Sequence, residues 1–141
     1  MKRVAIVYWS GSGNTEKMAE CIAEGVRESG GEAVLMGPSA FSADQLREYD
    51  AVAFGCPAMG AEQLEESEFE PMFAGLEGSL NGKKVALFGS YGWGDGQWMR
   101  DWCARCDHAN LVDDAGLIVN EAPGEGEQEA CRALGRRMVQ G

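Results

Sequence analysis

A chain of 141 residues gives room for one hydrophobic core, so we expect a single domain over residues 1–141. Hydrophobic residues make up 45% and charged residues 25% of it, which is ordinary for a globular protein, and no apolar run reaches the roughly 18 residues of a membrane span. The formal net charge of −11 argues against nucleic acid as a partner, since phosphate binding needs Lys and Arg, and it suits encounters with basic protein surfaces.

Apolar runs typical of β-strands alternate along the chain with segments of helical periodicity. In residues 15–29, Met18, Ile22 and Val26 share one helix face, and the glycine pair 30–31 ends the segment. The elements expected in chain order are a strand at 4–8, a helix at 15–29, a strand at 33–36, a short helix at 43–48 capped by Ser42, a strand at 51–56, a helix at 65–76 with Pro71 early in it, a strand at 84–89, a helix at 97–106, a strand around 117–119 and a helix at 127–139.

Five strands with intervening helices predict an α/β fold, a parallel sheet covered on both faces. Right-handed crossovers then give a three-layer α-β-α doubly wound sheet, for which 2-1-3-4-5 is a common strand order. Ligands in such sheets bind beyond the carboxyl ends of the strands, where the order reverses. The loops after the first, third and fourth strands are therefore the expected site.

The loop after the first strand, residues 9–15, has the character of a phosphate-binding loop. Its glycines let backbone amides turn inward, and the helix that follows adds N–H groups and a positive dipole. Its other polar donors are the side chains of Ser10, Ser12, Asn14 and Thr15. The loop has no Lys, which excludes a P-loop, and Glu16 stands where a dinucleotide fingerprint needs its third glycine. The alternative is that Asn14 or Thr15 merely caps a helix.

The pattern Ser10-x-Ser12-Gly13-x-Thr15 resembles the [ST]-x-[ST]-G-x-T phosphate loop of flavodoxins. Residues 7–20, 64–71 and 82–101 are further similar to the short-chain flavodoxins of anaerobic bacteria. The resemblance implies a flavodoxin-like fold and a low-potential one-electron carrier. It would hold FMN non-covalently, pass through semiquinone and hydroquinone states, and have no catalytic residue and no metal.

The same resemblance assigns the flavin ring to the loops after the third and fourth strands. It implies that Met59 packs on the inner face of the ring, that Trp93 stacks on the outer face, that Glu62 accepts a hydrogen bond from N3–H and that Asn120 lies near the ring edge. Alternatively, Met59 and Trp93 are core side chains. The expected cofactor-binding residues of these loops are Pro57, Ala58, Met59, Gly60, Ala61, Glu62, Ser90, Tyr91, Gly92, Trp93, Gly94 and Asp95, and Gly11 and Gly13 join the phosphate loop.

A redox-linked peptide flip at Gly60 is also implied by the resemblance. After the first electron, the Gly60 carbonyl would accept a hydrogen bond from flavin N5–H. Ala61 stands where many relatives carry Asp, Asn or Gly. If the oxidised turn has φ > 0 at position 61, alanine favours the reduced arrangement by ~1 kcal/mol.

Carboxylates near an anionic flavin would lower the second reduction potential. The alternative is that they form only a solvated face. The candidates are Glu62, Glu65, Glu66, Asp95 and Glu121.

Partners are expected to be ferredoxin-using oxidoreductases with basic docking surfaces. The alternative function is an FMN-dependent NAD(P)H reductase on the same fold, and a protein that only stores FMN is a further one. The apolar start is too short for a signal peptide, so we expect a cytoplasmic monomer with reduced thiols. Cys103 and Cys106 form a C-x-x-C late in a helix, which we interpret as incidental, and lone His108 does not complete a zinc site.

Overall fold

All the strand pairings in the sheet are parallel, as the alternation of apolar runs and helices predicts. The computed structural model describes residues 1–140. The strands are β1 (Arg3–Tyr8), β2 (Glu32–Met36), β3 (Ala51–Gly55), β4 (Lys84–Tyr91), β5 (Asn110–Leu111) and β6 (Leu117–Asn120). Their order is β2-β1-β3-β4-β5, and β6 also pairs with β4. The doubly wound topology is confirmed.

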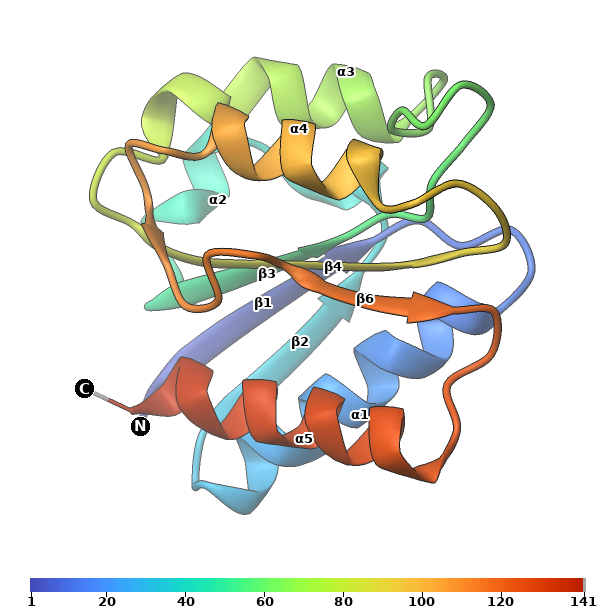
Figure 1. Ribbon diagram of the computed structural model, residues 1–141. Coiled ribbons are helices and arrows are strands. Elements are labelled where there is room, and N and C mark those ends of the chain that lie inside the picture. The colour runs from blue at the N-terminus through green and yellow to red at the C-terminus, as the bar shows by residue number, and fades with distance from the viewer. Residues whose placement is uncertain (141) are drawn as a thin grey trace.

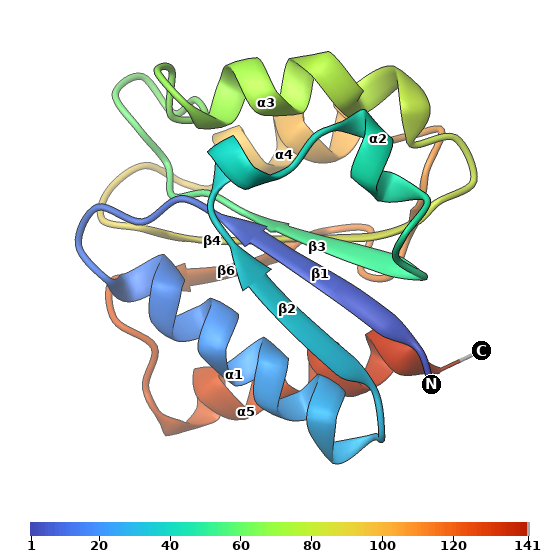
Figure 2. The same cartoon turned by 180° about the vertical axis from the view of Figure 1, so that it is seen from behind.

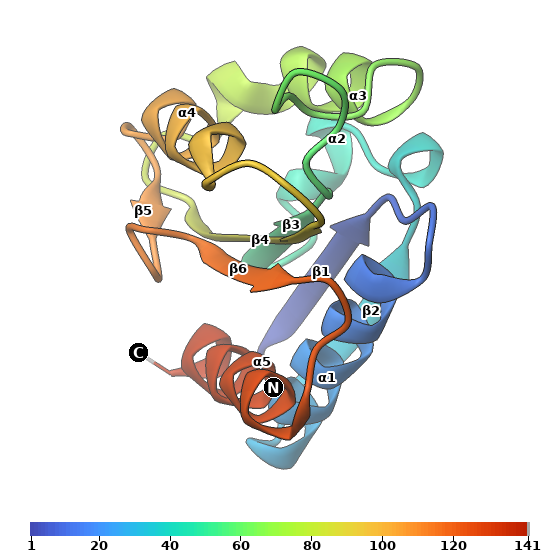
Figure 3. The ribbon, with the colours of Figure 1, turned by 45° about the vertical axis from the view of Figure 1, so that its right-hand side comes forward.

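Helices cover both faces of this sheet (Figures 1 and 2). One layer consists of α1 (Asn14–Glu28) and α5 (Glu125–Val139); the other consists of α2 (Ala43–Leu46), α3 (Phe69–Leu76) and α4 (Gln97–Arg105), with short 3₁₀ turns at Pro38–Ala40 and Glu77–Ser79. Seen from the side, the sheet separates the two helical layers (Figure 3). Among residues 1–140, none of the helices is long and apolar enough to cross a membrane.

Successive side chains of each central strand point to opposite faces of the sheet and so contribute to two hydrophobic cores, one on each face. In β3, Ala51 and Ala53 pack toward α1 and α5, whereas Val52 and Phe54 pack toward α3 and α4. The α3/α4 side is aromatic: Phe54 and Phe73 meet edge to face with ring centroids 5.2 Å apart. The small side chains on the other face let α1 and α5 approach closely. A Cβ at Gly25 would lie 1.9 Å from a carbonyl oxygen of α5, so only glycine fits there.

Two elements differ from the sequence prediction. The fifth strand is divided into β5 and β6 by a turn at residues 112–116, in which the Gly116 N–H donates to the Asp113 carbonyl at 3.1 Å and Gly116 has φ +76°. The helix expected at 65–76 begins only at Phe69. The Glu65 carboxylate accepts the N–H groups of Glu68 and Phe69 at 2.8 and 2.9 Å, so residues 65–68 form a cap rather than a first turn.

Candidate cofactor-binding site

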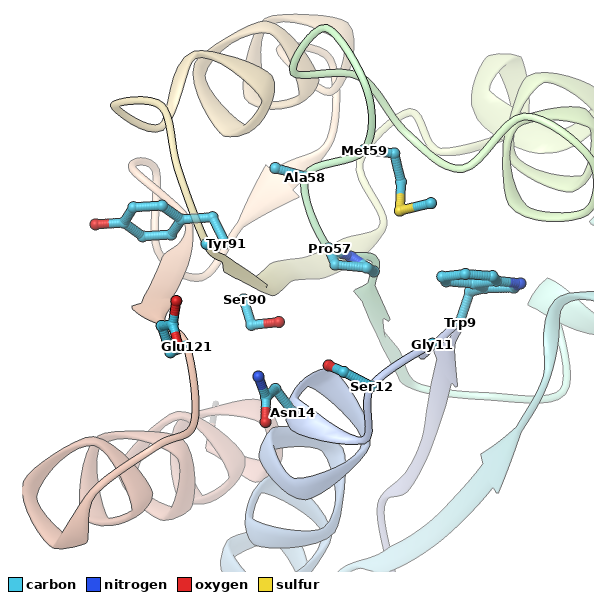
Figure 4. A pocket seen from close by; sticks show the side chains of 11 residues that line it. Trp9, Gly11, Ser12, Asn14, Pro57, Ala58, Met59, Ser90, Tyr91 and Glu121 are labelled. Carbon is cyan, nitrogen blue, oxygen red and sulfur yellow. The ribbon is translucent and has the colours of Figure 1, made fainter.

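A cavity of about 300 Å³ opens at the carboxyl ends of β1, β3, β4 and β6 (Figure 4). This volume lies within the usual range of small-molecule pockets. It is where a sheet of this order is expected to bind its ligand. The lining residues are Trp9, Gly11, Ser12, Asn14, Pro57, Ala58, Met59, Ser90, Tyr91, Gly92 and Glu121.

The hydroxyl of Ser10 fixes the conformation of the loop after β1. Ser10 Oγ accepts the N–H groups of Gly13 and Glu16 at 3.1 and 3.2 Å, and Gly13, with φ +97°, is the residue before α1. This leaves Ser12 and Asn14 beside the cavity, at the N-terminus of the helix (Figure 4). Uncharged donors at a helix N-terminus fit a phosphate group.

The turn after β3 is held at both of its ends. The Ala58 N–H donates to the Ser90 carbonyl at 3.1 Å, and Met59 and Gln63 exchange two backbone hydrogen bonds of 2.9 Å. Positive φ falls on Gly60 (+49°) and Glu62 (+55°). Ala61 itself does not have positive φ here, so the condition under which alanine would favour the reduced arrangement is not met in this conformation.

The carboxylates singled out in the sequence have different surroundings. Glu65 is buried as the cap of α3, and burial raises the pKa of its carboxyl, but hydrogen bonds from Ser67 and the start of α3 outweigh this and lower the pKa to about 2. Asp95 pairs with Arg100 at 3.0 Å, and Glu62 accepts a backbone N–H of α4. Glu121 is the one charged side chain among the described residues that line the cavity.

Two lining residues were not among the predicted cofactor-binding residues. Trp9 stands over the phosphate loop, its ring 3.2 Å from where a Cβ of Gly11 would lie, and its Nε1 donates to Glu68 Oε1 at 3.2 Å. Glu121 enters the cavity because its backbone turns left-handed, with φ +62°, directly after β6. The sequence analysis names Glu121 only as a candidate carboxylate near the flavin, and it assigns the ring edge to its neighbour Asn120.

Nine of the predicted cofactor-binding residues line the cavity, and the other ten do not. Thr15 is buried behind the loop, and the Asn120 side chain donates to the Tyr91 carbonyl at 3.2 Å. Trp93 is 59% exposed. The predicted residues that do not line the cavity are Ser10, Gly13, Thr15, Gly60, Ala61, Glu62, Trp93, Gly94, Asp95 and Asn120.

The C-x-x-C lies at the carboxyl end of α4, as the sequence analysis expected. Burial, reinforced by Asp113 and Asp114, raises the pKa of the Cys103 thiol, and burial raises that of Cys106 to about 12. Neither thiol is therefore an activated nucleophile at neutral pH. Within residues 1–140, no group of three or more His, Cys, Asp or Glu side chains is placed to hold a metal ion.

The donor set and the walls of the cavity fit FMN. The loop before α1 offers uncharged donors for a phosphate, while Met59, Tyr91 and the ring of Trp9 provide flat or polarisable apolar surface. All of these groups face one cavity (Figure 4). Together they describe a protein that binds a flavin nucleotide in a doubly wound sheet.

Comparisons with known proteins agree with this class. Residues 6–135 match the family described as Flavodoxin. The chain is 51% identical to a flavodoxin of Clostridium beijerinckii, over 95% of this chain and 97% of that one, and 44% identical to a flavodoxin of Megasphaera elsdenii, over 94% and 95%. The solution structure of two-electron reduced M. elsdenii flavodoxin superposes with a TM-score of 0.89 at 42% identity, covering 98% of this chain and 99% of that one.

The chain belongs to the flavodoxin family. It is accordingly an FMN-binding electron-transfer protein and not an enzyme, and the alternative of an NAD(P)H reductase is not favoured.

Proposed function

We propose that residues 1–141 act as one FMN-binding domain that carries single electrons at low potential in the cytoplasm, as a monomer. FMN supplies the one-electron chemistry when bound. The observation that carries this proposal is that the helix N-terminus after β1 and the loops after β3 and β4 line the same cavity. An electron carrier needs this arrangement because it holds the cofactor firmly while leaving one edge of it near the surface.

In this proposal, Ser12, Asn14 and the amides of the loop bind the phosphate. Met59 and Tyr91 contact the ring, and exposed Trp93 covers its outer face when FMN is bound. In the reduced states, the Gly60 carbonyl would accept a hydrogen bond from flavin N5–H, as the sequence analysis expects. The left-handed conformation of Gly60 supports this role. A Cβ at Gly60 would have no neighbour within 4 Å, so glycine is favoured there by its backbone conformation alone and not by crowding.

Redox partners of the proposed carrier are ferredoxin-using oxidoreductases with basic docking surfaces. The net charge of −11 supports this, as does Glu121, which lines the cavity. Complementary charge accelerates encounter and is screened by salt, so binding should be brief and salt-sensitive. A low second potential follows from the same charges, because Glu121 faces the cavity and no described Lys or Arg lines it.

Titration of the apoprotein with FMN and with riboflavin tests the placement of the phosphate. Ser12→Ala should weaken FMN binding roughly tenfold, because a hydrogen bond to a charged group is lost, and should change riboflavin binding little. Ser39→Ala, an exposed serine outside the cavity, is the matched control. Equal losses for FMN and riboflavin in Ser12→Ala would contradict the assignment.

A further inference from the structure

One side chain joins the turn after β3 to the start of α4. Glu62 Oε1 accepts the backbone N–H of Gln97 at 3.0 Å, across 35 residues of sequence. We propose that Glu62 is a positioning residue that ties the redox-linked turn at residues 59–63 to the loop at 92–96, which carries Trp93. The link itself stands on geometry, whereas its consequence for electron transfer rests on the proposed function.

The N-terminus of α4 has no cap of its own. The residue before the helix is Gly96, which has φ +91° and no side chain to offer. Gln97 is the first helical residue, so its N–H has no acceptor within the helix. Glu62 supplies that acceptor from another loop. A carboxylate at this position also interacts favourably with the positive end of the helix dipole.

Glu62 occupies an unfavourable backbone conformation to do this. Its φ of +55° lies in the left-handed region, which is sterically unfavourable for a residue with a Cβ. The two backbone hydrogen bonds between Met59 and Gln63 close the turn around it. A glycine at position 62 would avoid the strain but could not reach α4, which is a physical reason for a glutamate here.

The carboxylate is also seated against the backbone of Gly94. A Cβ at Gly94 would lie 2.6 Å from Glu62 Cδ and 2.7 Å from Oε1, closer than nonbonded atoms approach. Gly94 has φ +86° as well, so the position favours glycine for two separate reasons. Glu62 is thus held between Gly94 and Gln97. A change in the turn at 59–63 therefore moves the support of the loop that carries Trp93.

Hydrogen exchange tests the link, measured in the FMN-loaded protein and in the apoprotein, where Glu62 has no hydrogen bond to flavin N3–H to lose. Glu62→Ala should accelerate exchange of the Gln97 amide about tenfold, as expected for a lost helix cap. Glu62→Gln retains an acceptor oxygen and should remain within about threefold of the native chain. Glu20→Ala removes an exposed carboxylate of α1, outside both loops, and should leave Gln97 unchanged. An unchanged Gln97 amide in Glu62→Ala would overturn the proposal, as would equal effects of the Gln and Ala variants, since these would reduce Glu62 to a surface charge.

A double-mutant cycle tests the contact with Gly94. Gly94→Ala should displace the carboxylate and accelerate exchange at Gln97. In the Glu62→Ala background the same substitution should accelerate exchange less, because only the backbone strain of the left-handed position then remains. Additive effects of the two substitutions would contradict the proposed contact.

Comparison of oxidised and reduced protein tests the coupling to the redox state. Exchange at Gln97 should change on reduction in the native chain and not in Glu62→Ala, and the absence of a change in the native chain would overturn the coupling. Exchange at Gln97 can also be followed in the apoprotein, so failure of the link is distinguishable from failure of the proposed FMN site.

Discussion

Thr15 Oγ1 and Ser90 Oγ lie 3.0 Å apart in the interior, and the Ser90 N–H also reaches Thr15 Oγ1 at 3.3 Å. Thr15 is in the first turn of α1 and Ser90 is near the end of β4, so this pair fixes the phosphate loop to the sheet. Both residues are almost fully buried, at 1% and 5% exposure. Buried polar groups are costly when they are unpaired, so the hydrogen bond between Thr15 and Ser90 stabilises the folded protein as well as holding the phosphate loop in place.

Thr15→Val keeps the shape of the side chain and removes its hydroxyl. We expect the free energy of unfolding of the apoprotein to fall by about 1–3 kcal/mol, since Ser90 loses its partner, and FMN affinity to fall as well. Ser12→Ala is the contrast, because exposed Ser12 should affect FMN affinity while leaving stability within about 0.5 kcal/mol. Urea unfolding and FMN titration measure the two effects. Identical stabilities for both variants would contradict the role of the Thr15–Ser90 pair.

Glu65 makes the free energy of unfolding depend on pH. Its pKa is lowered from an ordinary 4.5 to about 2, so its contribution is present above about pH 4.5 and disappears as pH falls toward 2. Glu65→Gln should lower stability at pH 7 by about 1–3 kcal/mol, because four donors then share one weaker acceptor. The difference between the native chain and the variant should shrink as the pH falls from 4.5 toward 2. Urea unfolding at several pH values measures it, with exposed Glu66→Gln as the control; a difference that is independent of pH would rule this out.

Trp98 and Trp102, both buried on α4, provide a matched pair. Trp98 Nε1 donates to the Cys56 carbonyl at 3.1 Å, whereas Trp102 Nε1 has no hydrogen-bond partner among residues 1–140. Both substitutions by Phe remove similar volume, but only Trp98→Phe leaves a buried carbonyl without its donor. We therefore expect Trp98→Phe to be more destabilising by about 1–2 kcal/mol. Urea unfolding of both variants gives the answer, and equal losses would mean that the Trp98 hydrogen bond contributes nothing measurable.

Glu121 should oppose the binding of an anionic cofactor. Removing its charge in Glu121→Gln should tighten FMN binding roughly threefold at low salt and raise the second reduction potential. The gain should shrink as salt is added, because the interaction is screened. Asp114→Asn, an exposed carboxylate outside the cavity, should change neither quantity. Weaker FMN binding in Glu121→Gln would show instead that the carboxylate accepts a hydrogen bond from the cofactor.

Much of the fold follows from local pattern. The alternation of apolar strands with periodic helices was sufficient for the layers and for the strand order, because right-handed crossovers leave few topologies. The division of the last strand was missed because β5 is only two residues long, too short to show a strand pattern, and its pairing with β4 depends on the turn around Gly116. Likewise, Glu65 was read as part of a helix because a side chain that caps backbone groups has the same sequence pattern as one that begins a turn.

The site was predictable where it depends on backbone position and less so where it depends on side-chain direction. Loops at the carboxyl ends of parallel strands lie together whatever side chains they carry, and Ser12, Met59 and Tyr91 accordingly line the same cavity. Whether a carboxylate faces the cavity depends on a single φ angle, and Glu121 does so through its left-handed backbone. Glu62 shows the converse, since its side chain reaches α4, a contact that no local pattern encodes.

The measurement that tests the account most directly is stepwise reduction of the FMN-loaded protein while its visible spectrum is recorded. A one-electron carrier predicts a long-wavelength absorption band that rises to half reduction and then falls, with two separate midpoint potentials. A direct two-electron bleach without such a band would contradict the proposed carrier mechanism, although the fold and the FMN site would stand.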